Sequence, residues 1–207
     1  MRFLIQEIQR CVVAEIDPNQ SGDGALIIDE SAIAKKGKDS VGVKRQYAGA
    51  LGKVDNCQVG VFLAYATRSQ TSLIARSLYL PKEWCEDPER CFEGGIPLKN
   101  QEFKTKAEIA LDLVKEAVEN GIPFSFVHMD AHYGVQPWLL DSFDDMGITW
   151  FADISKGMSI LVHWRGDSCT IGGVIPETLA GNNHFSYINT RSKLKHWPTS
   201  KPMLLAL

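Results

Sequence analysis

Three side chains with metal-binding chemistry stand at alternate positions in one apolar stretch of the chain. His128, Asp130 and His132 fall within the segment PFSFVHMDAHYGVQPWLL, residues 123–140. Alternate side chains of a strand share one face, so the three could meet one ion, and imidazole with carboxylate would suit zinc. The other interpretation is a single functional carboxylate between two histidines that merely pack. The stretch by itself leaves both open.

A second carboxylate occurs in the same setting earlier in the chain. Asp29 follows the apolar run Leu-Ile-Ile, as Asp130 follows Phe-Val-His-Met, and we expect each aspartate near the end of its strand. Burying an unpaired carboxylate is costly, so such residues are paired, hydrogen-bonded or bound to metal. A single one is commonly a helix N-cap or a turn residue. Two of them on neighbouring strands favour a shared divalent cation, Mg²⁺ or Mn²⁺, which prefers carboxylate oxygens. Glu30 would point to the opposite face.

The order of predicted elements puts both aspartates on strands. The hydrophobic pattern predicts strands over 24–33, 57–67 and 72–80, a helix over 105–121, a strand over 122–130, a helix over 137–147 and a strand over 148–155. Thr105 and Glu108 form a capping box at the start of the first helix. Three strands with short connections indicate an antiparallel meander, and the helix-linked strands that follow indicate parallel pairing. We therefore expect an α/β fold built on a mixed sheet.

The composition is that of an ordinary soluble globular protein. With 44% hydrophobic and 23% charged residues the chain is not disordered, and no apolar run is long enough to span a membrane. The N-terminus is a poor signal peptide. Five scattered cysteines without a CxxC pair argue against a disulfide framework or a structural zinc site. We therefore expect a cytoplasmic protein with no membrane partner.

A basic block follows the first predicted strand. Between residues 34 and 53 the only acid is Asp39, whereas the cations are Lys35, Lys36, Lys38, Lys44, Arg45 and Lys53. The net charge of −3 gives no overall attraction to nucleic acid. The block could contact DNA phosphates through Lys35, Lys36, Lys44, Arg45 and Lys53. It could equally be the solvated surface of a hairpin.

The segment IIDESAIAKKGKDSVGVKRQYAGALGKVDNCQVGVFLAYAT, residues 27–67, resembles the core of the DDE transposases of bacterial insertion sequences. The later pieces LYLPKEW, FKTKAEIALDLV, VHMDAHYG and WFADISK are similar to that family in the same order. The resemblance covers about residues 20–160. The first block is long and specific, whereas the Asp-x-x-Tyr-Gly piece alone would be weak.

The resemblance implies a ribonuclease-H-like fold with Asp29 as the first catalytic acid and Asp130 as the second. It also implies a DNA endonuclease and strand-transfer activity, in which three acids hold two divalent ions for in-line phosphoryl transfer. The expected partners are DNA, as transposon ends and target, and further copies of this chain or a full-length transposase. His128 and His132 would then pack or support the site.

The last part of the chain departs from the family pattern. The family places its third acid, a Glu, in a late helix, but after WFADISK the only carboxylates are Asp167 and Glu177. We therefore expect a lead-in segment over 1–20, a catalytic core over 21–160, and a divergent or truncated segment over 161–207 that leaves the fold incomplete and the chain inactive alone. The alternatives are a non-catalytic remnant that binds DNA or a transposase, and a zinc hydrolase built on His128 and His132.

Overall fold

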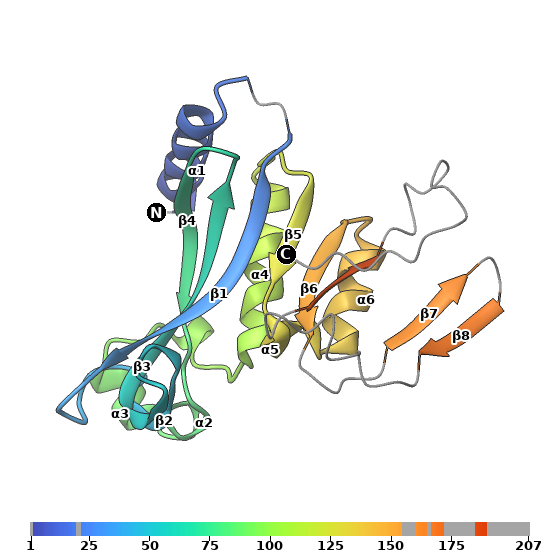
Figure 1. The fold of residues 1–207 in the computed structure, drawn as a ribbon. Coiled ribbons are helices and arrows are strands. Elements are labelled where there is room, and N and C mark those ends of the chain that lie inside the picture. Colours follow the sequence, from blue (N-terminus) through green and yellow to red (C-terminus); the bar gives the residue numbers. More distant parts are fainter. Residues whose placement is uncertain (1, 20–21, 155–159, 165–166, 172–184, 190–207) are drawn as a thin grey trace. The chain divides into compact units, whose positions relative to one another are not determined.

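The computed structural model describes residues 2–19, 22–154, 160–164, 167–171 and 185–189 (Figure 1). Two compact units make up the chain. Unit 1 is residues 1–127 and unit 2 is residues 128–207.

Unit 1 contains four complete strands and four helices among its described residues. They are α1 (Arg2–Ile16), β1 (Ala25–Ala34), β2 (Lys44–Ala48), β3 (Lys53–Ala66), β4 (Thr71–Leu78), α2 (Lys82–Cys85), α3 (Pro88–Glu93) and α4 (Lys106–Glu119), with short 3-10 turns at Gly49–Leu51 and Leu98–Asn100. β5 (Phe126–Met129) crosses the boundary between the units. The described part of unit 2 then holds α5 (Ala131–Gly134), α6 (Pro137–Asp145), β6 (Trp150–Ile154), β7 (Ile160–Trp164), β8 (Asp167–Ile171) and β9 (Phe185–Asn189).

The sheet of unit 1 is organised around β3. β1 pairs antiparallel with β3 from Ala25↔Ala66 to Ala34↔Cys57. β2 also pairs with Cys57, through Lys44, so β1 and β2 lie on opposite edges of β3. β4 continues along the edge that β2 occupies, starting at Gly60↔Leu78. The predicted antiparallel meander is therefore confirmed, with β2 as an additional strand inside the segment expected to form turns and a hairpin.

The side chains of β3 alternate strictly between two faces of this sheet. Val59, Val61, Leu63 and Tyr65 are fully buried, whereas the even-numbered positions between them are partly exposed. We call the two sides the buried face and the exposed face. Opposite residues of an antiparallel pair share a face, so the exposed face takes odd positions of β1 and β2 and even positions of β3.

The helices of unit 1 contact the buried face. Lys106, the first residue of α4, forms an ion pair with Glu30 of β1, and α4 packs against β3. α1 packs against β4, and Asp17, the residue after α1, accepts a hydrogen bond from the Tyr65 hydroxyl. The apolar stripe of α4 and the odd-numbered side chains of β3 thus form the core of the unit.

β5 begins beside β1. The Ser125 N–H donates to the Gly24 carbonyl at 2.7 Å, one residue before each strand starts. β5 follows β1 in the strand order of the sheet (Figure 1), and α4 connects β4 to β5 along the chain. The chain is thus α/β with a mixed sheet of antiparallel and parallel strands, as the sequence predicts.

In unit 2 the predicted helix over 137–147 and strand over 148–155 are confirmed by α6 and β6. β6 pairs antiparallel with β9, from Trp150↔Asn189 to Ile154↔Phe185. β7 and β8 form a two-stranded antiparallel sheet.

Buried polar contacts fix α1 to the rest of unit 1. Gln9 and Asn120, each 1% exposed, are joined by a hydrogen bond of 2.6 Å from the Asn120 side-chain amide. The Arg10 guanidinium donates to the carbonyl of the same Asn120, which is the C-cap of α4. These bonds satisfy groups at the end of α4 that the helix itself leaves unpaired.

Stability should fall at high pH, in part because of Tyr65. Burial raises the pKa of Tyr65 to about 12, and the hydrogen bond to Asp17 adds to the shift. An unfolded tyrosine ionises near pH 10, so between about pH 10 and 12 the unfolded chain loses a proton that the folded chain keeps. The free energy of unfolding should fall in that window, by on the order of 2 kcal/mol.

Urea unfolding at pH 9 and pH 11 tests this expectation. Tyr65→Phe should show a smaller loss between the two pH values than wild type, whereas the exposed Tyr47→Phe should lose as much as wild type. An equal loss in Tyr65→Phe and wild type would contradict the assignment.

Candidate functional site

Asp29 lies in the middle of β1, on the exposed face of unit 1. It pairs with Phe62 of β3, and its own neighbours Leu26 and Ile28 are buried. The expectation that Asp29 lies near the end of its strand is wrong, because β3 supplies partners to β1 as far as Ala34. The carboxylate is nevertheless exposed to solvent, so a cation from solution can reach it. Its Oδ1 accepts a hydrogen bond of 2.7 Å from the Glu30 N–H.

Glu30 points to the buried face, as predicted, and is anchored to α4. Its Oε1 lies 2.8 Å from the Lys106 ammonium, and the two side chains are 24% and 20% exposed. The predicted capping box fixes the start of α4: Thr105 accepts from the Glu108 N–H, and Glu108 accepts from the Thr105 N–H. Lys106 therefore fixes Glu30 by an ion pair, and the backbone N–H of Glu30 in turn donates to the Asp29 carboxylate.

Asp130 caps a short helix at the end of β5. Its Oδ1 accepts from the His132 N–H at 2.9 Å and from the Tyr133 N–H at 3.3 Å, at the start of α5. The carboxylate is half-buried. Asp130 is thus the helix N-cap that such a residue commonly becomes. Both bonds use Oδ1, so the capping role leaves Oδ2 to take a cation.

The two histidines that flank Asp130 do not join it in a zinc site. α5 begins at Ala131, so the strand alternation breaks before His132, which is exposed and packs edge-on against Tyr133. His128 Nε2 lies 3.6 Å from Asp153 Oδ1 of β6. Across the part of the chain that the structure describes, no three His, Cys, Asp or Glu side chains gather closely enough to hold a metal ion. Among the described residues the structure therefore does not bring His128, Asp130 and His132 together as a zinc centre.

The remaining candidate acids are only partly described. Asp29 belongs to unit 1, and Asp130 belongs to unit 2. Asp167 is the first residue of β8, but its side chain lies outside the described residues, as does the whole of Glu177.

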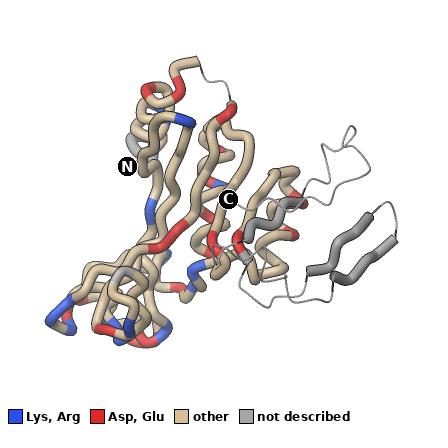
Figure 2. Tube along the Cα trace, in the orientation of Figure 1, with Lys and Arg blue, Asp and Glu red and all other residues tan. Residues whose placement is uncertain are grey.

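The cations of the basic block divide between the two faces. Figure 2 shows positive charge gathered at the turn that follows β1. Lys44 and Lys53 fall on the side of the buried face, where Lys44 pairs with Glu83 and Lys53 lies 3.0 Å from Asp55. The hydrogen bond from each lysine lowers the pKa of its acid, Glu83 and Asp55 respectively.

The other cations of the block have a different setting. Arg45 falls on the exposed face, opposite Asn56 of β3. The Lys35 N–H donates to the Asn56 carbonyl, which continues the β1–β3 register by one residue. Lys36 is exposed in the turn beyond. Of the five predicted DNA contacts, two are therefore neutralised by acids, and Lys35, Lys36 and Arg45 remain candidates.

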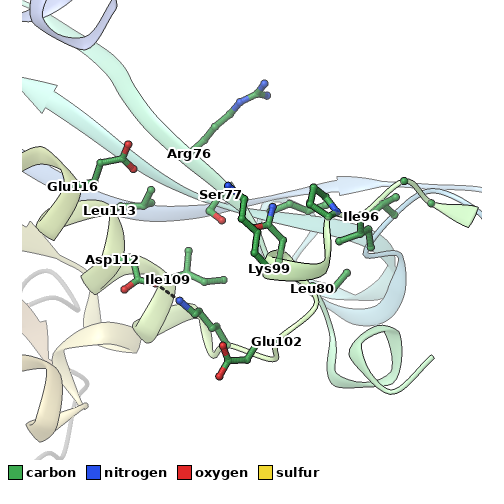
Figure 3. Close-up of a pocket in the computed structure, with 17 residues that line it drawn as sticks. Arg76, Ser77, Leu80, Ile96, Lys99, Glu102, Ile109, Asp112, Leu113 and Glu116 are labelled. Carbon is green, nitrogen blue, oxygen red and sulfur yellow. Dashed lines mark hydrogen bonds and ion pairs between the residues drawn. The ribbon is translucent and has the colours of Figure 1, made fainter. Parts of the chain in front are cut away.

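A cavity of about 480 Å³ lies between β4, residues 94–104 and α4, away from the Asp29 carboxylate. Its apolar lining includes Leu80, Ile96, Ile109 and Leu113. Asp112, labelled in Figure 3, also lines the cavity and forms an ion pair of 2.6 Å with Lys104, whose pKa this hydrogen bond raises. Arg76 and Ser77 of β4 also line the cavity. The cavity opens on the α4 side of the sheet, so it does not contain the candidate metal ligands.

The part of the chain that matches a known protein family includes both Asp29 and Asp130. Residues 2–166 match the family model described as DDE superfamily endonuclease, and the chain belongs to this family. The resemblance to DDE transposases is thus confirmed.

The chain is also similar in sequence to a curated protein. Over 109 residues the chain is 35% identical to the "Probable transposase for insertion sequence element IS701" of Microchaete diplosiphon. The matched segment is 53% of this chain, but the chain spans only about a quarter (26%) of that relative. No helix within the described ranges is long and apolar enough to cross a membrane.

Removing the Lys106 ammonium should destabilise the chain. Exposed ion pairs contribute up to ~1 kcal/mol, and breaking a buried pair costs about 3–5 kcal/mol. The Glu30–Lys106 pair lies between these cases, so Lys106→Met should lower the free energy of unfolding by about 2 kcal/mol. Urea unfolding measures the change.

Two variants control this measurement. Lys104→Met removes a more exposed pair near the same end of α4 and should cost less than ~1 kcal/mol. Lys106→Arg keeps the charge and should recover most of the loss. Equal effects of Lys106→Met and Lys104→Met would contradict a special role for the Glu30 pair.

Proposed function

We propose that this chain supplies two carboxylates, Asp29 and Asp130, to a divalent-metal centre that cuts and joins DNA. One observation carries the proposal. Each carboxylate is held by backbone N–H groups while it stays accessible to solvent: Asp29 accepts from the Glu30 N–H, and Asp130 accepts from the His132 and Tyr133 N–H groups. Because the chain belongs to the DDE superfamily endonucleases, this setting supports both residues as ligands of a divalent cation.

The chemistry of the two side chains fits such a cation. Mg²⁺ and Mn²⁺ prefer carboxylate oxygens, and each aspartate has one oxygen engaged by backbone N–H groups. Those N–H donors hold each carboxylate in one orientation, so little reorganisation is needed when a cation binds. When bound, the metal would activate water or a DNA 3′-hydroxyl and stabilise the leaving oxygen of an in-line phosphoryl transfer.

The substrate class follows from the family and the relative. We propose DNA, as transposon ends and target, because the chain belongs to the DDE superfamily endonucleases and resembles a probable transposase. Further copies of this chain, or a full-length transposase, are the proposed protein partners. Loss of one ligand from a two-metal site costs most of its catalysis, so low activity is expected of this chain alone if no third acid joins Asp29 and Asp130.

A second candidate function is DNA binding without cleavage. The exposed position of Arg45 and the cations of the β1 turn favour it, because phosphate contacts need no metal. DNA binding with no metal-dependent nicking in any preparation would select this candidate.

Nicking of supercoiled plasmid in Mg²⁺ or Mn²⁺ tests the proposed centre. Asp29→Ala and Asp130→Ala should each lower the nicking rate by on the order of 100-fold, because each removes a metal ligand. Asp141→Ala removes an exposed carboxylate from α6 and should leave the rate unchanged. Equal rates for wild type, Asp29→Ala and Asp130→Ala would eliminate a metal-dependent role for both residues.

A further inference from the structure

Two cations stand in one row across the exposed face of unit 1. Asn56 of β3 is flanked by Arg45 on β2 and by Lys35 at the end of β1. The Asn56 side-chain amide donates to the carbonyls of Lys35 and Gly37, both at 2.8 Å, and so fixes the turn that carries Lys35. The register places Lys35, Asn56 and Arg45 on the same side of the sheet.

An exposed aromatic ring follows in the next row. Tyr47 pairs with Val54, and these two side chains are 62% and 54% exposed. Tyr47 lies two positions after Arg45 along β2, so both share the exposed face. If this hairpin were only a solvated surface, a large aromatic ring would not be expected to be exposed next to two cations.

On the other side of the sheet, the cations of the basic block are paired with acids. Lys44 and Lys53 fall on the side of the buried face, and each is neutralised by an acid, Glu83 or Asp55. The division between neighbouring cations follows from the strand alternation, because Lys44 and Arg45 are consecutive.

Asp29 lies on the same side of the sheet. Asp29, Ser31, Ile33 and Lys35 are successive odd positions, so they form one line along β1. Six residues of strand span about 20 Å. We call the line of Asp29, Ser31, Ile33 and Lys35, continued by Arg45 and Tyr47, the Asp29–Tyr47 strip.

We propose that the Asp29–Tyr47 strip binds a single-stranded segment of DNA next to the cleaved phosphodiester, an inference that rests on the proposed function of Asp29. Lys35 and Arg45 contact backbone phosphates, and Tyr47 stacks on a base. A groove of cations with an aromatic platform is how proteins hold single strands without sequence preference, since every base has a face to stack. A duplex would keep its bases stacked on each other and leave Tyr47 without a role.

Metal-free binding to a fluorescein-labelled 12-nucleotide single strand, followed by anisotropy in EDTA, tests the phosphate contacts. Lys35→Ala/Arg45→Ala should weaken binding about tenfold and reduce the slope of log affinity against log salt by about 1.4, as expected for two lost contacts. The matched control, Lys44→Ala/Lys53→Ala, removes the same charge from the other face and should bind within about twofold of wild type. An equal loss in both double variants, or none in the first, would overturn the proposal.

Tyr47 has its own comparison in the same assay. Tyr47→Ala should weaken single-strand binding roughly tenfold, and Tyr47→Phe should bind like wild type because the ring remains. Tyr47→Ala binding as tightly as wild type would overturn the stacking role, as would a Tyr47→Phe loss equal to that of Tyr47→Ala. A duplex of the same sequence should be insensitive to Tyr47→Ala, and an equal loss on duplex would overturn the single-strand assignment.

The two proposals fail separately. Binding in EDTA involves no metal. The effects of the Lys35, Arg45 and Tyr47 variants on binding can therefore be measured separately from the effect of Asp29→Ala on nicking. If Asp29→Ala nicks like wild type, the metal centre is wrong and the strip loses its assigned place beside the cleaved bond. If Asp29→Ala abolishes nicking and all strip variants bind like wild type, the strip alone is wrong.

Discussion

The pairing of β1 with β3 determines the direction of every candidate side chain on β1. Ten residue pairs set this register, and the side chains alternate between the two faces along it. A slip of one residue would turn Asp29 into the core and bring Glu30 to the surface. The buried residues Leu26, Ile28 and their partners on β3 oppose such a slip because it would expose them all. The buried apolar residues of β1 and β3 thus fix the face on which the Asp29 carboxylate lies.

Asp29 and Glu30 are adjacent on β1 but face opposite sides of the sheet, because side chains alternate along a strand. Glu30 faces α4 and is neutralised by Lys106, whereas Asp29 faces solvent and is held by a backbone N–H. The same division recurs at Lys44 and Arg45, one paired with an acid and one on the exposed face. Charge on this sheet is therefore organised by the alternation of the strands, and the side away from α4 is the one that carries both Arg45 and the Asp29 carboxylate that we propose as a metal ligand.

For Asp130 the observed structural role is compatible with the functional role that we propose. A carboxylate that caps a helix is fixed by two N–H donors through one oxygen. A metal ligand needs the same fixed orientation with a second oxygen facing outward. The common N-cap interpretation and the metal interpretation are therefore compatible for this residue, whereas the zinc triplet would need a strand that continues to His132, and β5 ends at Met129.

Local patterns in the sequence were sufficient for α4 with its capping box, for the antiparallel strands and for the family, because periodicity and short motifs are properties of neighbouring residues. The amphipathic pattern did not reveal β2, the central position of Asp29 in β1, or the pairing of Lys44 and Lys53 with acids. Those features depend on partners far along the chain: β3 extends β1 past Asp29, and α2 brings Glu83 to Lys44. Residue types alone thus identified the acids and cations, and only the tertiary pairing decided which face each one occupies, since a strand's faces are defined by what packs against them.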